Sequence, residues 1–522
     1  MFIQSDKVQK DSVIDCDLCI VGGGAAGITI ALLLKKLPIN ICIIESGDLK
    51  KNEKIQILND VETTDLPIGS PARARQFGGT TTLWVGRWKP HDKIDFEKRD
   101  WVVNSGWPIS LFDLEPYYQK SATLLDAPNY SNFSLNSPDL NNQHIIDSNN
   151  IETSVFRWLE KKDFDWGKKY QDEFSSSETV KVFLNGNVVN LITDNDKKSI
   201  KALDVKTIEG NKFSVRSKIF ILAAGGLENA RILLISDIGN EYDQVGRYYM
   251  DHPKELVGEV NLFNNNTDLA LYWGLIGDSK QLRAGLKLKD ETQKQNKVLN
   301  SYILLEPIFS WSYNPGMKAV INIVQLIKGR KIPFDIIKQH ILEILKNKKV
   351  VFEFAFFELK KRILNKKEIV KKVKIWNFLE QEPRSENKVS LSDEKDLLGI
   401  PKIKLSWSIG ELDKKTIVFL HKILDKELQN LGIGELKSPL LHDNLASWPI
   451  SRDASHHMGT TRMGNDPKTS VVDKNCKVHN IDNLYIAGSS VFVTSGYANP
   501  TYTIVALATR LAEYIQNKIN KK

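Results

Sequence analysis

At 522 residues, the chain is longer than one hydrophobic core usually supports, so we expect two or more domains. Its 41% hydrophobic and 26% charged residues are ordinary for a globular enzyme. No apolar run approaches the ~20 residues of a membrane span, and residues 1–15 lack the apolar segment of a secretory signal. Four cysteines argue against a disulfide scaffold, and we expect a cytoplasmic protein.

The net charge of +8 is unevenly distributed along the chain. Residues 318–374 carry sixteen Lys or Arg against five Asp or Glu, an excess of eleven positive charges. The rest of the chain therefore has a small negative net charge. Strong basicity is a property of this one segment, and no nucleic-acid-binding motif accompanies it.

The chain opens with a predicted β-α-β unit. A buried strand at 18–21 leads through a glycine turn into a helix at 25–37, and a second strand follows at 39–44. Pro38, which has no backbone N–H, separates the helix from the second strand. Glu45 ends that strand.

The remaining elements follow from changes in hydrophobic periodicity. Strands are predicted within 179–224, at 256–263, 282–288, 298–305, 375–381, 387–392 and 402–407, and helices at 227–236, within 317–373 and at 501–517. Ile337, Ile341, Ile344 and Leu345 have the spacing of one apolar helix face.

This order predicts an α/β protein with a discontinuous Rossmann-like nucleotide-binding domain. A second domain, an antiparallel sheet with helices (α+β), is inserted into it. The predicted segments are 1–127, 179–255 and 445–522 for the first domain, 128–178 for a connection that contributes to the second, and 256–444 for the second, with a basic helical insert at 317–373.

The first glycine turn has the spacing of a pyrophosphate site. Gly22 permits the tight turn, Gly24 lets the backbone approach a phosphate, and Gly27 allows close packing of strand and helix. The helix N-terminus adds N–H donors and a positive dipole end. Glu45 is placed to accept hydrogen bonds from ribose hydroxyls, and its charge disfavours a 2′-phosphate. We therefore predict dinucleotide binding.

Separate glycine segments at 78–79, 225–226 and 488 favour FAD over NAD. A large isoalloxazine would contact several distant loops, whereas NAD is usually held by one continuous domain. Near the C-terminus, His456 offers a titratable base and Asn499 an amide. A dinucleotide combined with a base suggests redox chemistry on an alcohol.

The chain resembles the glucose–methanol–choline (GMC) family of FAD-dependent oxidoreductases, and within it the branch of the pyranose oxidases and bacterial sugar dehydrogenases. The motifs that carry the resemblance are Gly22–Gly27 with Glu45, Gly78–Thr80, Gly106–Pro108, Leu114–Tyr118, Ala223–Glu228, Asp251–Pro253, Glu380–Pro383, Lys388–Ser392 and 456–513.

The resemblance implies that His456 removes the proton of a substrate hydroxyl while hydride passes to flavin N5, with Asn499 holding the same oxygen. His457 is the alternative base, His252 an expected supporting residue, and Asn499 could instead cap the final helix. The implied FAD-binding residues are Gly22, Gly24, Ala25, Ala26, Gly27, Glu45, Gly78, Gly79, Thr80, Trp84, Val188, Ala224, Gly225, Gly488, Ser489, Asn499, Pro500 and Thr501.

Two positions depart from the pyranose-oxidase pattern. Leu83 stands where that branch has the histidine bonded covalently to FAD, so we expect non-covalent FAD. Val85 replaces a threonine beside the flavin, which weakens the case for oxygen as electron acceptor and leaves a quinone or a protein open.

The predicted function is oxidation of a hydroxyl of a sugar or sugar derivative. A non-sugar alcohol, or a flavin-fold lyase or binding protein without redox turnover, remain alternatives, and no metal site is expected. The basic segment 318–374, with phenylalanines among its lysines, fits a solvated face packed on the second domain, a peripheral membrane contact, or an acidic protein or oligomer contact.

Overall fold

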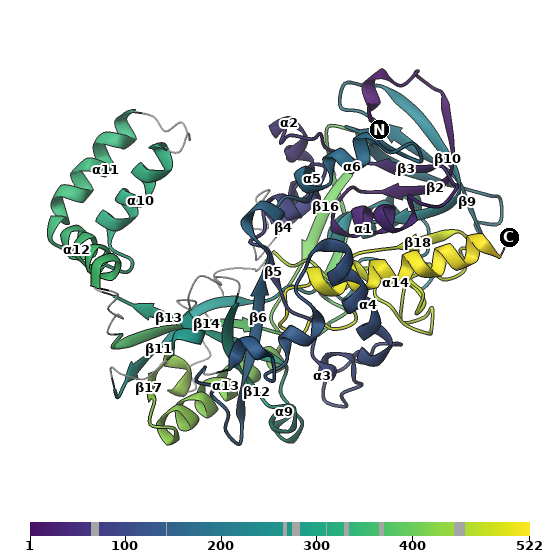
Figure 1. Cartoon of the computed structure of the whole chain (residues 1–522). Coiled ribbons are helices and arrows are strands. Elements are labelled where there is room, and N and C mark those ends of the chain that lie inside the picture. Colours follow the sequence, from purple (N-terminus) through teal and green to yellow (C-terminus); the bar gives the residue numbers. More distant parts are fainter. Residues whose placement is uncertain are drawn as a thin grey trace.

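Two large sheets form the body of the molecule (Figure 1). The computed structural model describes residues 1–63, 72–141, 143–264, 269–273, 282–309, 311–327, 334–364, 370–442 and 455–521. Of the helices in these residues, none is long and apolar enough to cross a lipid bilayer.

The first sheet has a parallel centre and an antiparallel edge. Its strands, in spatial order, are β1 (Phe2–Gln4), β7 (Val180–Leu184), β3 (Ile41–Ile44), β2 (Val13–Val21), β10 (Lys212–Leu222), β9 (Ile200–Lys206) and β8 (Asn187–Thr193), with β18 (Leu484–Ile486) paired to β10. The strands β1, β7, β3, β2, β10 and β18 run parallel to one another, so their carboxyl ends lie at one edge, whereas β9 pairs antiparallel with β10.

Helices cover this first sheet. α1 (Ala25–Leu34) is apolar almost all round and buried, because it lies against the sheet and also packs on the C-terminal helix α14 (Thr501–Asn520). α14 packs in turn on α4 (Leu111–Leu125), and α7 (Gly225–Ser236) packs on β8. The shorter helices are α2 (Glu53–Gln56), α3 (Lys93–Phe96), α5 (Trp166–Lys169) and α6 (Gln171–Ser175).

The second sheet is antiparallel. Its spatial order is β17 (Gly434–Lys437), β11 (Lys254–Leu262), β14 (Lys372–Leu379), β13 (Ser301–Ile308), β12 (Leu282–Leu288), β6 (Ile151–Trp158) and β5 (Arg87–Trp88). The helices that accompany it are α8 (Ala270–Trp273), α9 (Asp290–Asn296) and α13 (Glu411–Asn430). A third small sheet joins β15 (Lys388–Lys395), β16 (Pro401–Ser406) and β4 (Val61–Thr63).

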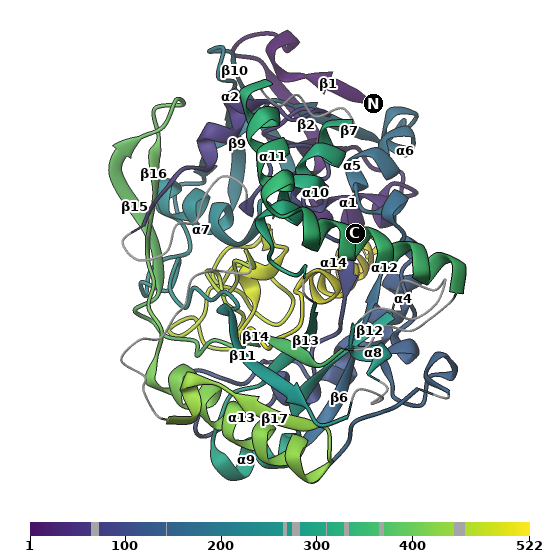
Figure 2. The same ribbon diagram turned by 90° about the vertical axis from the view of Figure 1, so that its left-hand side faces the viewer.

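The predicted fold class is confirmed: an α/β nucleotide-binding layer is combined with an antiparallel-sheet domain. Figure 2 shows the C-terminal segment, in yellow, between the two layers. The domain boundaries stay predictions, and the one between residues 444 and 445 lies outside the described residues. Two strands pair across the predicted segments: β5, which falls within 1–127, pairs with β6 in the second sheet, and β16, which falls within 256–444, pairs with β4.

Element ends differ from the predicted ones in understandable ways. The first strand begins at Val13, five residues before its fully apolar part, because β10 continues to pair with it there. The first helix ends at Leu34, where polar residues Lys35 and Lys36 follow. The helical segment resolves into α10 (Pro315–Ile327), α11 (Phe334–Lys346) and α12 (Lys348–Leu364), with 328–333 and 365–369 outside the described residues.

Candidate active site

A deep cavity begins at the carboxyl ends of the parallel strands. Its volume is about 530 Å³, and one continuous wall runs from Gly22 and Glu45 to His456 and Asn499. Each predicted loop is tied to the neighbouring strand. Gly22 N–H donates to the Ile44 carbonyl, and Ala223 N–H donates to the Val21 carbonyl, both at 2.8 Å. The glycine loops therefore meet at one place although hundreds of residues separate them.

Most of the predicted FAD-binding residues line this cavity. They are Gly22, Gly24, Ala25, Ala26, Glu45, Gly79, Thr80, Trp84, Val188, Ala224, Gly225, Gly488, Ser489, Asn499, Pro500 and Thr501. Gly27 and Gly78 are the two that are not in its wall. A Cβ on Gly27 would lie 2.0 Å from the Gly22 carbonyl oxygen, and one on Gly78 would lie 2.5 Å from the Gly167 nitrogen. These two glycines shape the turns by allowing close backbone approach.

Glu45 is buried at the end of β3, with both carboxylate oxygens held by backbone donors. Oε2 accepts from Gly23 N–H at 2.7 Å, and Oε1 accepts from Gly47 N–H at 2.8 Å. Burial nevertheless raises the pKa of Glu45 above its ordinary value. Oε1 also accepts from Ser46 Oγ at 3.4 Å, whereas Oε2 keeps a second lone pair for a hydroxyl in the cavity.

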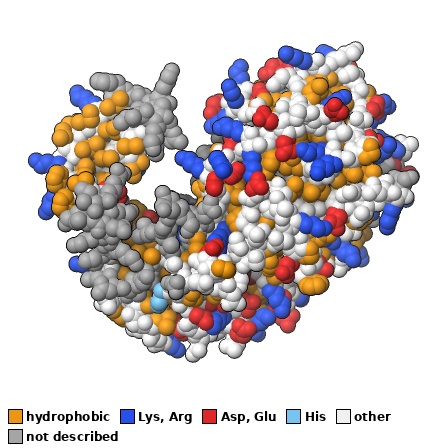
Figure 3. All heavy atoms as spheres, viewed as in Figure 1, with side chains coloured by type: hydrophobic (Ala, Val, Ile, Leu, Met, Phe, Trp, Pro, Cys, Tyr) orange, Lys and Arg blue, Asp and Glu red, His pale blue; other side chains and the backbone are white. Residues whose placement is uncertain are grey.

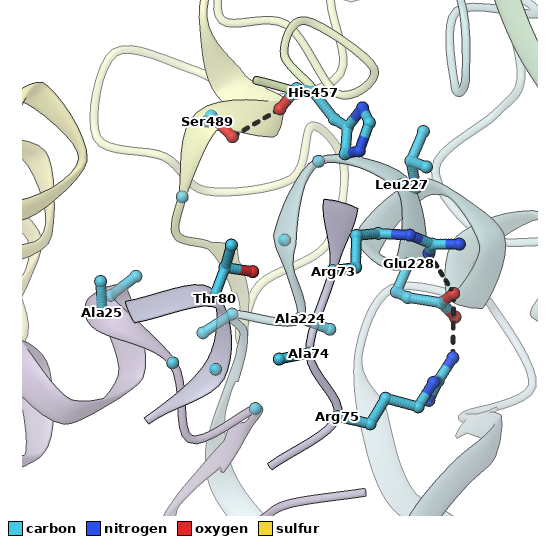
Figure 4. A pocket seen from close by; sticks show the side chains of 18 of the residues that line it. Ala25, Arg73, Ala74, Arg75, Thr80, Ala224, Leu227, Glu228, His457 and Ser489 are labelled. Carbon is cyan, nitrogen blue, oxygen red and sulfur yellow. Dashed lines mark hydrogen bonds and ion pairs between the residues drawn. The ribbon is translucent and has the colours of Figure 1, made fainter. Parts of the chain in front are cut away.

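An arginine cluster that the sequence patterns did not single out forms another part of the wall. Arg73 and Arg75 each approach Glu228 Oε1 at 2.9 Å, as Figure 4 shows, and Arg231 approaches Oε2 at 3.4 Å. Burial opposes ionisation of Glu228, but the three guanidinium groups lower its pKa to about 2. The cluster therefore carries a net positive charge at one side of the cavity.

His456 and Asn499, the two predicted catalytic residues, meet in the cavity: Asn499 Nδ2 lies 3.3 Å from His456 Nε2. Asn499 does not cap the final helix, so that alternative is wrong. Pro500 is the N-cap residue of α14, and no side chain caps it. The Asn499 carboxamide is oriented instead by Arg87, whose Nε–H donates to Oδ1 at 2.5 Å.

Arg87 is a functional candidate that sequence reasoning missed. Its buried guanidinium lies over the rings of Phe156 and Phe378, at 5.2 and 5.0 Å from their centroids. Since arginine can only donate, the Asn499 atom facing it must be the carbonyl oxygen, which turns the NH₂ group toward His456. Strand β5 has two residues, too few for any periodicity to mark this position.

His252 lies beside His456 because Met250 and Met458 exchange two backbone hydrogen bonds, at 3.0 and 2.9 Å. The Asp251 carboxylate accepts the backbone N–H groups of both histidines. His252 Nδ1 is 3.0 Å from His456 Nδ1, and its Nε2 is 3.2 Å from the Ser495 carbonyl oxygen.

These contacts assign the tautomers. A carbonyl oxygen can only accept, so His252 Nε2 carries a hydrogen and its Nδ1 has a lone pair. His456 Nδ1 must then be the donor, which leaves the lone pair of His456 on Nε2, inside the cavity. Burial is the main cause that holds the pKa of His456 well below its ordinary value, and the electrostatic effects of His252 and Arg87 act in the same direction. The ring is therefore a neutral base.

His457, the alternative base, occupies a different part of the wall. Its Nδ1 is 2.8 Å from the Tyr249 hydroxyl, and burial lowers its pKa to about 3. Its backbone carbonyl accepts from Ser489 Oγ at 2.6 Å (Figure 4). Asn499, by contrast, pairs with His456, so the geometry favours His456 as the base.

Comparison with known proteins agrees with this site. The family model for GMC oxidoreductases matches residues 383–508, the segment that holds His456 and Asn499. The C-terminal segment of the chain therefore resembles the GMC oxidoreductases. Two relatives that align with nearly the whole chain are named as a dehydrogenase and an oxidase.

Curated relatives of this chain are distant in sequence. The large subunit of fructose dehydrogenase from Gluconobacter japonicus is 25% identical over 65% of this chain and 55% of that one. The 2-methyl-1,2-propanediol dehydrogenase of Mycolicibacterium austroafricanum is 22% identical, covering 97% and 96%. A pyranose 2-oxidase from Tricholoma matsutake is 47% identical over 12% of this chain and 11% of that one. The chain thus spans about half the length of the first relative and nearly all of the second.

Formate oxidase from Aspergillus oryzae, an R554A variant studied for its FAD modification, has the same fold. Its TM-score is 0.59 at 17% identity, with 98% of this chain and 100% of that chain covered. At this identity the likeness establishes the fold.

The cavity fits the FAD that the GMC family binds. Gly225 and Gly488 line it with positive φ angles of 91° and 115°, and a Cβ on either would meet no protein atom of the described chain within 4 Å. His457 Nε2 is buried there and has no hydrogen-bond partner among the described residues. A bound dinucleotide would occupy the open space beside the glycine backbone and would supply a hydrogen-bond partner for the His457 nitrogen.

Two glycine substitutions should separate cofactor binding from folding. A Cβ on Gly24 would come no closer than 3.9 Å to protein, at Gly79 Cα, whereas one on Gly27 would collide with the Gly22 oxygen at 2.0 Å. We expect Gly24→Ala to raise the Kd for FAD by about tenfold or more without destabilising the chain. Gly27→Ala should lower the free energy of unfolding by about 1–3 kcal/mol.

The measurements are FAD titration by fluorescence quenching and denaturant unfolding of both variants beside the wild-type protein. A Gly24→Ala variant that binds FAD as tightly as wild type would show that the turn does not approach the cofactor.

Proposed function

We propose that this chain is a GMC oxidoreductase that oxidises a hydroxyl of a sugar or sugar derivative to a carbonyl, with His456 as the base and FAD as the cofactor. The observation that carries the proposal is the hydrogen-bonded series from Ser495 through His252 to His456, which leaves the His456 Nε2 lone pair in the cavity. A neutral imidazole in that tautomer is ready to accept a hydroxyl proton.

The substrate hydroxyl is held between the two catalytic residues. Its oxygen accepts from Asn499 Nδ2–H while its proton points at His456 Nε2. Arg87 keeps the amide turned so that its NH₂ group faces the substrate. Asn499 has no basic nitrogen, so it stabilises the developing alkoxide without taking the proton.

FAD, when bound, supplies the acceptor for the hydride that leaves the carbinol carbon. The turn at 22–26 and Glu45 would hold its dinucleotide part, and Asn499–Thr501 would lie at the reacting end. After proton transfer, the His456 imidazolium still donates from Nδ1 to His252 Nδ1, so the charged ring keeps its orientation. His252 is fully buried, which excludes water from the side of the pair away from the cavity.

Sugars are the favoured substrate class because relatives of this chain carry the names fructose dehydrogenase, pyranose 2-oxidase and C-glycoside 3-oxidase. A small diol is the second candidate, since the diol dehydrogenase aligns with nearly the whole chain. The cavity wall near His456 combines Phe378 with Lys254 and Arg87, an apolar surface beside polar groups.

Anaerobic mixing of the FAD-loaded enzyme with a panel of sugars, aminoglycosides and short diols tests the proposal. We expect a sugar to bleach the flavin absorbance and His456→Ala to slow that reduction by about 10²–10⁴-fold with FAD still bound. His457→Ala is the matched control and should retain most of the rate. Reduction by the diols alone would favour the second candidate. If no compound bleaches the flavin, or if His456→Ala reduces as fast as wild type, the assignment is wrong.

His252 is proposed as a positioning residue. Because the lowered His456 pKa keeps the base neutral in acid, the wild-type rate of flavin reduction should stay on its plateau below pH 6.5. His252→Leu removes the acceptor for His456 Nδ1–H and should lower the plateau by about 10–100-fold with little change in substrate affinity. His252→Gln offers an oxygen acceptor and should recover part of the rate. Equal plateaus for Leu and Gln would assign His252 a packing role only.

The FAD is proposed to be held without a covalent bond, because Leu83 lines the cavity at the position of the linking histidine and has no nucleophilic atom. Acid precipitation of the purified protein should leave the yellow colour in the supernatant. Colour retained in the washed pellet would contradict this. Val85 also lines the cavity, and the electron acceptor is left open among oxygen, a quinone and a protein.

A further inference from the structure

The three helices α10, α11 and α12 form a projection between β13 and β14. They pack mainly on one another, and Figure 1 shows them standing away from both sheets. At the base of the projection, Trp311 stacks with Phe309 at 5.1 Å between ring centroids and packs at a tilt against Phe357 at 5.0 Å. This aromatic cluster fixes one side of α12 and directs its other side outward.

Large apolar side chains remain exposed on the projection. Ile341, Leu342 and Leu345 share a face of α11, and Leu345 is 59% exposed. On α12, Phe352 is 73% exposed, and Leu359 lies two turns further along the same face. Figure 3 shows hydrophobic side chains gathered over this part of the surface. An exposed apolar patch of this kind marks an interaction surface.

Positive charge surrounds these apolar residues. Residues 318–374 hold an excess of eleven positive charges, and the exposed Lys346, Lys348 and Lys349 stand at the α11–α12 junction, between Leu345 and Phe352. Lys346 also pairs with Glu343 at 3.3 Å, a contact on the surface that leaves the excess large. Two copies of the chain would bring like charges together here, which opposes self-association through this face.

We propose that the face formed by α11 and α12 binds the surface of an anionic lipid bilayer. Leu345 and Phe352 would enter the boundary between headgroups and acyl chains, while Lys346, Lys348 and Lys349 contact the anionic headgroups. The contact is peripheral. Strand β14 spans roughly 20 Å from Lys372, near the base of the projection, to Phe378, which lines the cavity.

Sedimentation of the FAD-loaded, full-length protein with vesicles tests this inference. One set of vesicles contains phosphatidylcholine only, and the other contains phosphatidylcholine with about one third phosphatidylglycerol. We expect binding to the anionic vesicles that weakens steeply between low and high salt. Lys346→Glu combined with Lys348→Glu and Lys349→Glu should weaken binding by about 100-fold or more, and Phe352→Glu by about tenfold.

Matched controls come from other parts of the surface. Phe112 is 83% exposed on α4, and Lys7, Lys10 and Lys212 are exposed lysines at the first sheet. Phe112→Glu and the triple reversal of these lysines should bind vesicles as the wild type does. Unchanged rates of flavin reduction would show that all variants are folded.

Three outcomes would overturn the inference. They are no vesicle binding at low salt, equal loss of binding in the control variants, and a concentration-dependent dimer in light scattering that Phe352→Glu abolishes. Recovery of an acidic protein in place of lipid binding would likewise reassign the face.

Discussion

The structure depends on the parallel pairing of β10 with β2 on one side and with β18 on the other. Ala223 N–H donates to the Val21 carbonyl and Ala487 N–H to the Leu222 carbonyl, each at 2.8 Å. These two bonds bring the N-terminal, middle and C-terminal glycine turns to one sheet edge. Because β18 has only three residues, the long C-terminal segment is positioned by this short pairing together with the packing of α14 on α1.

The chemistry rests on a second set of long-range contacts. A backbone carbonyl, Ser495, determines through His252 which nitrogen of His456 carries the proton. His91 Nε2 approaches the same carbonyl oxygen at 2.9 Å, so two buried rings share one acceptor and help to hold it in place. Among the described residues, the ring of His456, the proposed base, is therefore oriented by neutral hydrogen bonds, which is consistent with a pKa kept low by burial.

Sequence patterns predicted the features that are determined by interactions between residues close together in the chain. The spacing from Gly22 to Glu45 follows from one β-α-β unit, so the sequence alone predicted that these residues share one site, and both line the same cavity. His456 and Asn499 came from a family resemblance, which no spacing could replace. Arg87 was missed because its partner, Asn499, lies 412 positions away in the sequence. The alternative role of Asn499 as a helix cap was wrong because the N-cap residue of α14 is Pro500. Such contacts are determined by tertiary packing, to which periodicity is blind.

The helical projection also shows the limit of prediction from periodicity. The spacing of Ile337, Ile341, Ile344 and Leu345 correctly predicts an amphipathic helix, yet periodicity does not say what covers its apolar face. In the fold this face is left partly open, and the projection is connected to the catalytic layer through β13 and β14. A partner bound at the helices would therefore fix the orientation of the whole molecule while the hydrogen bonds around His456, at the far end of β14, keep their geometry.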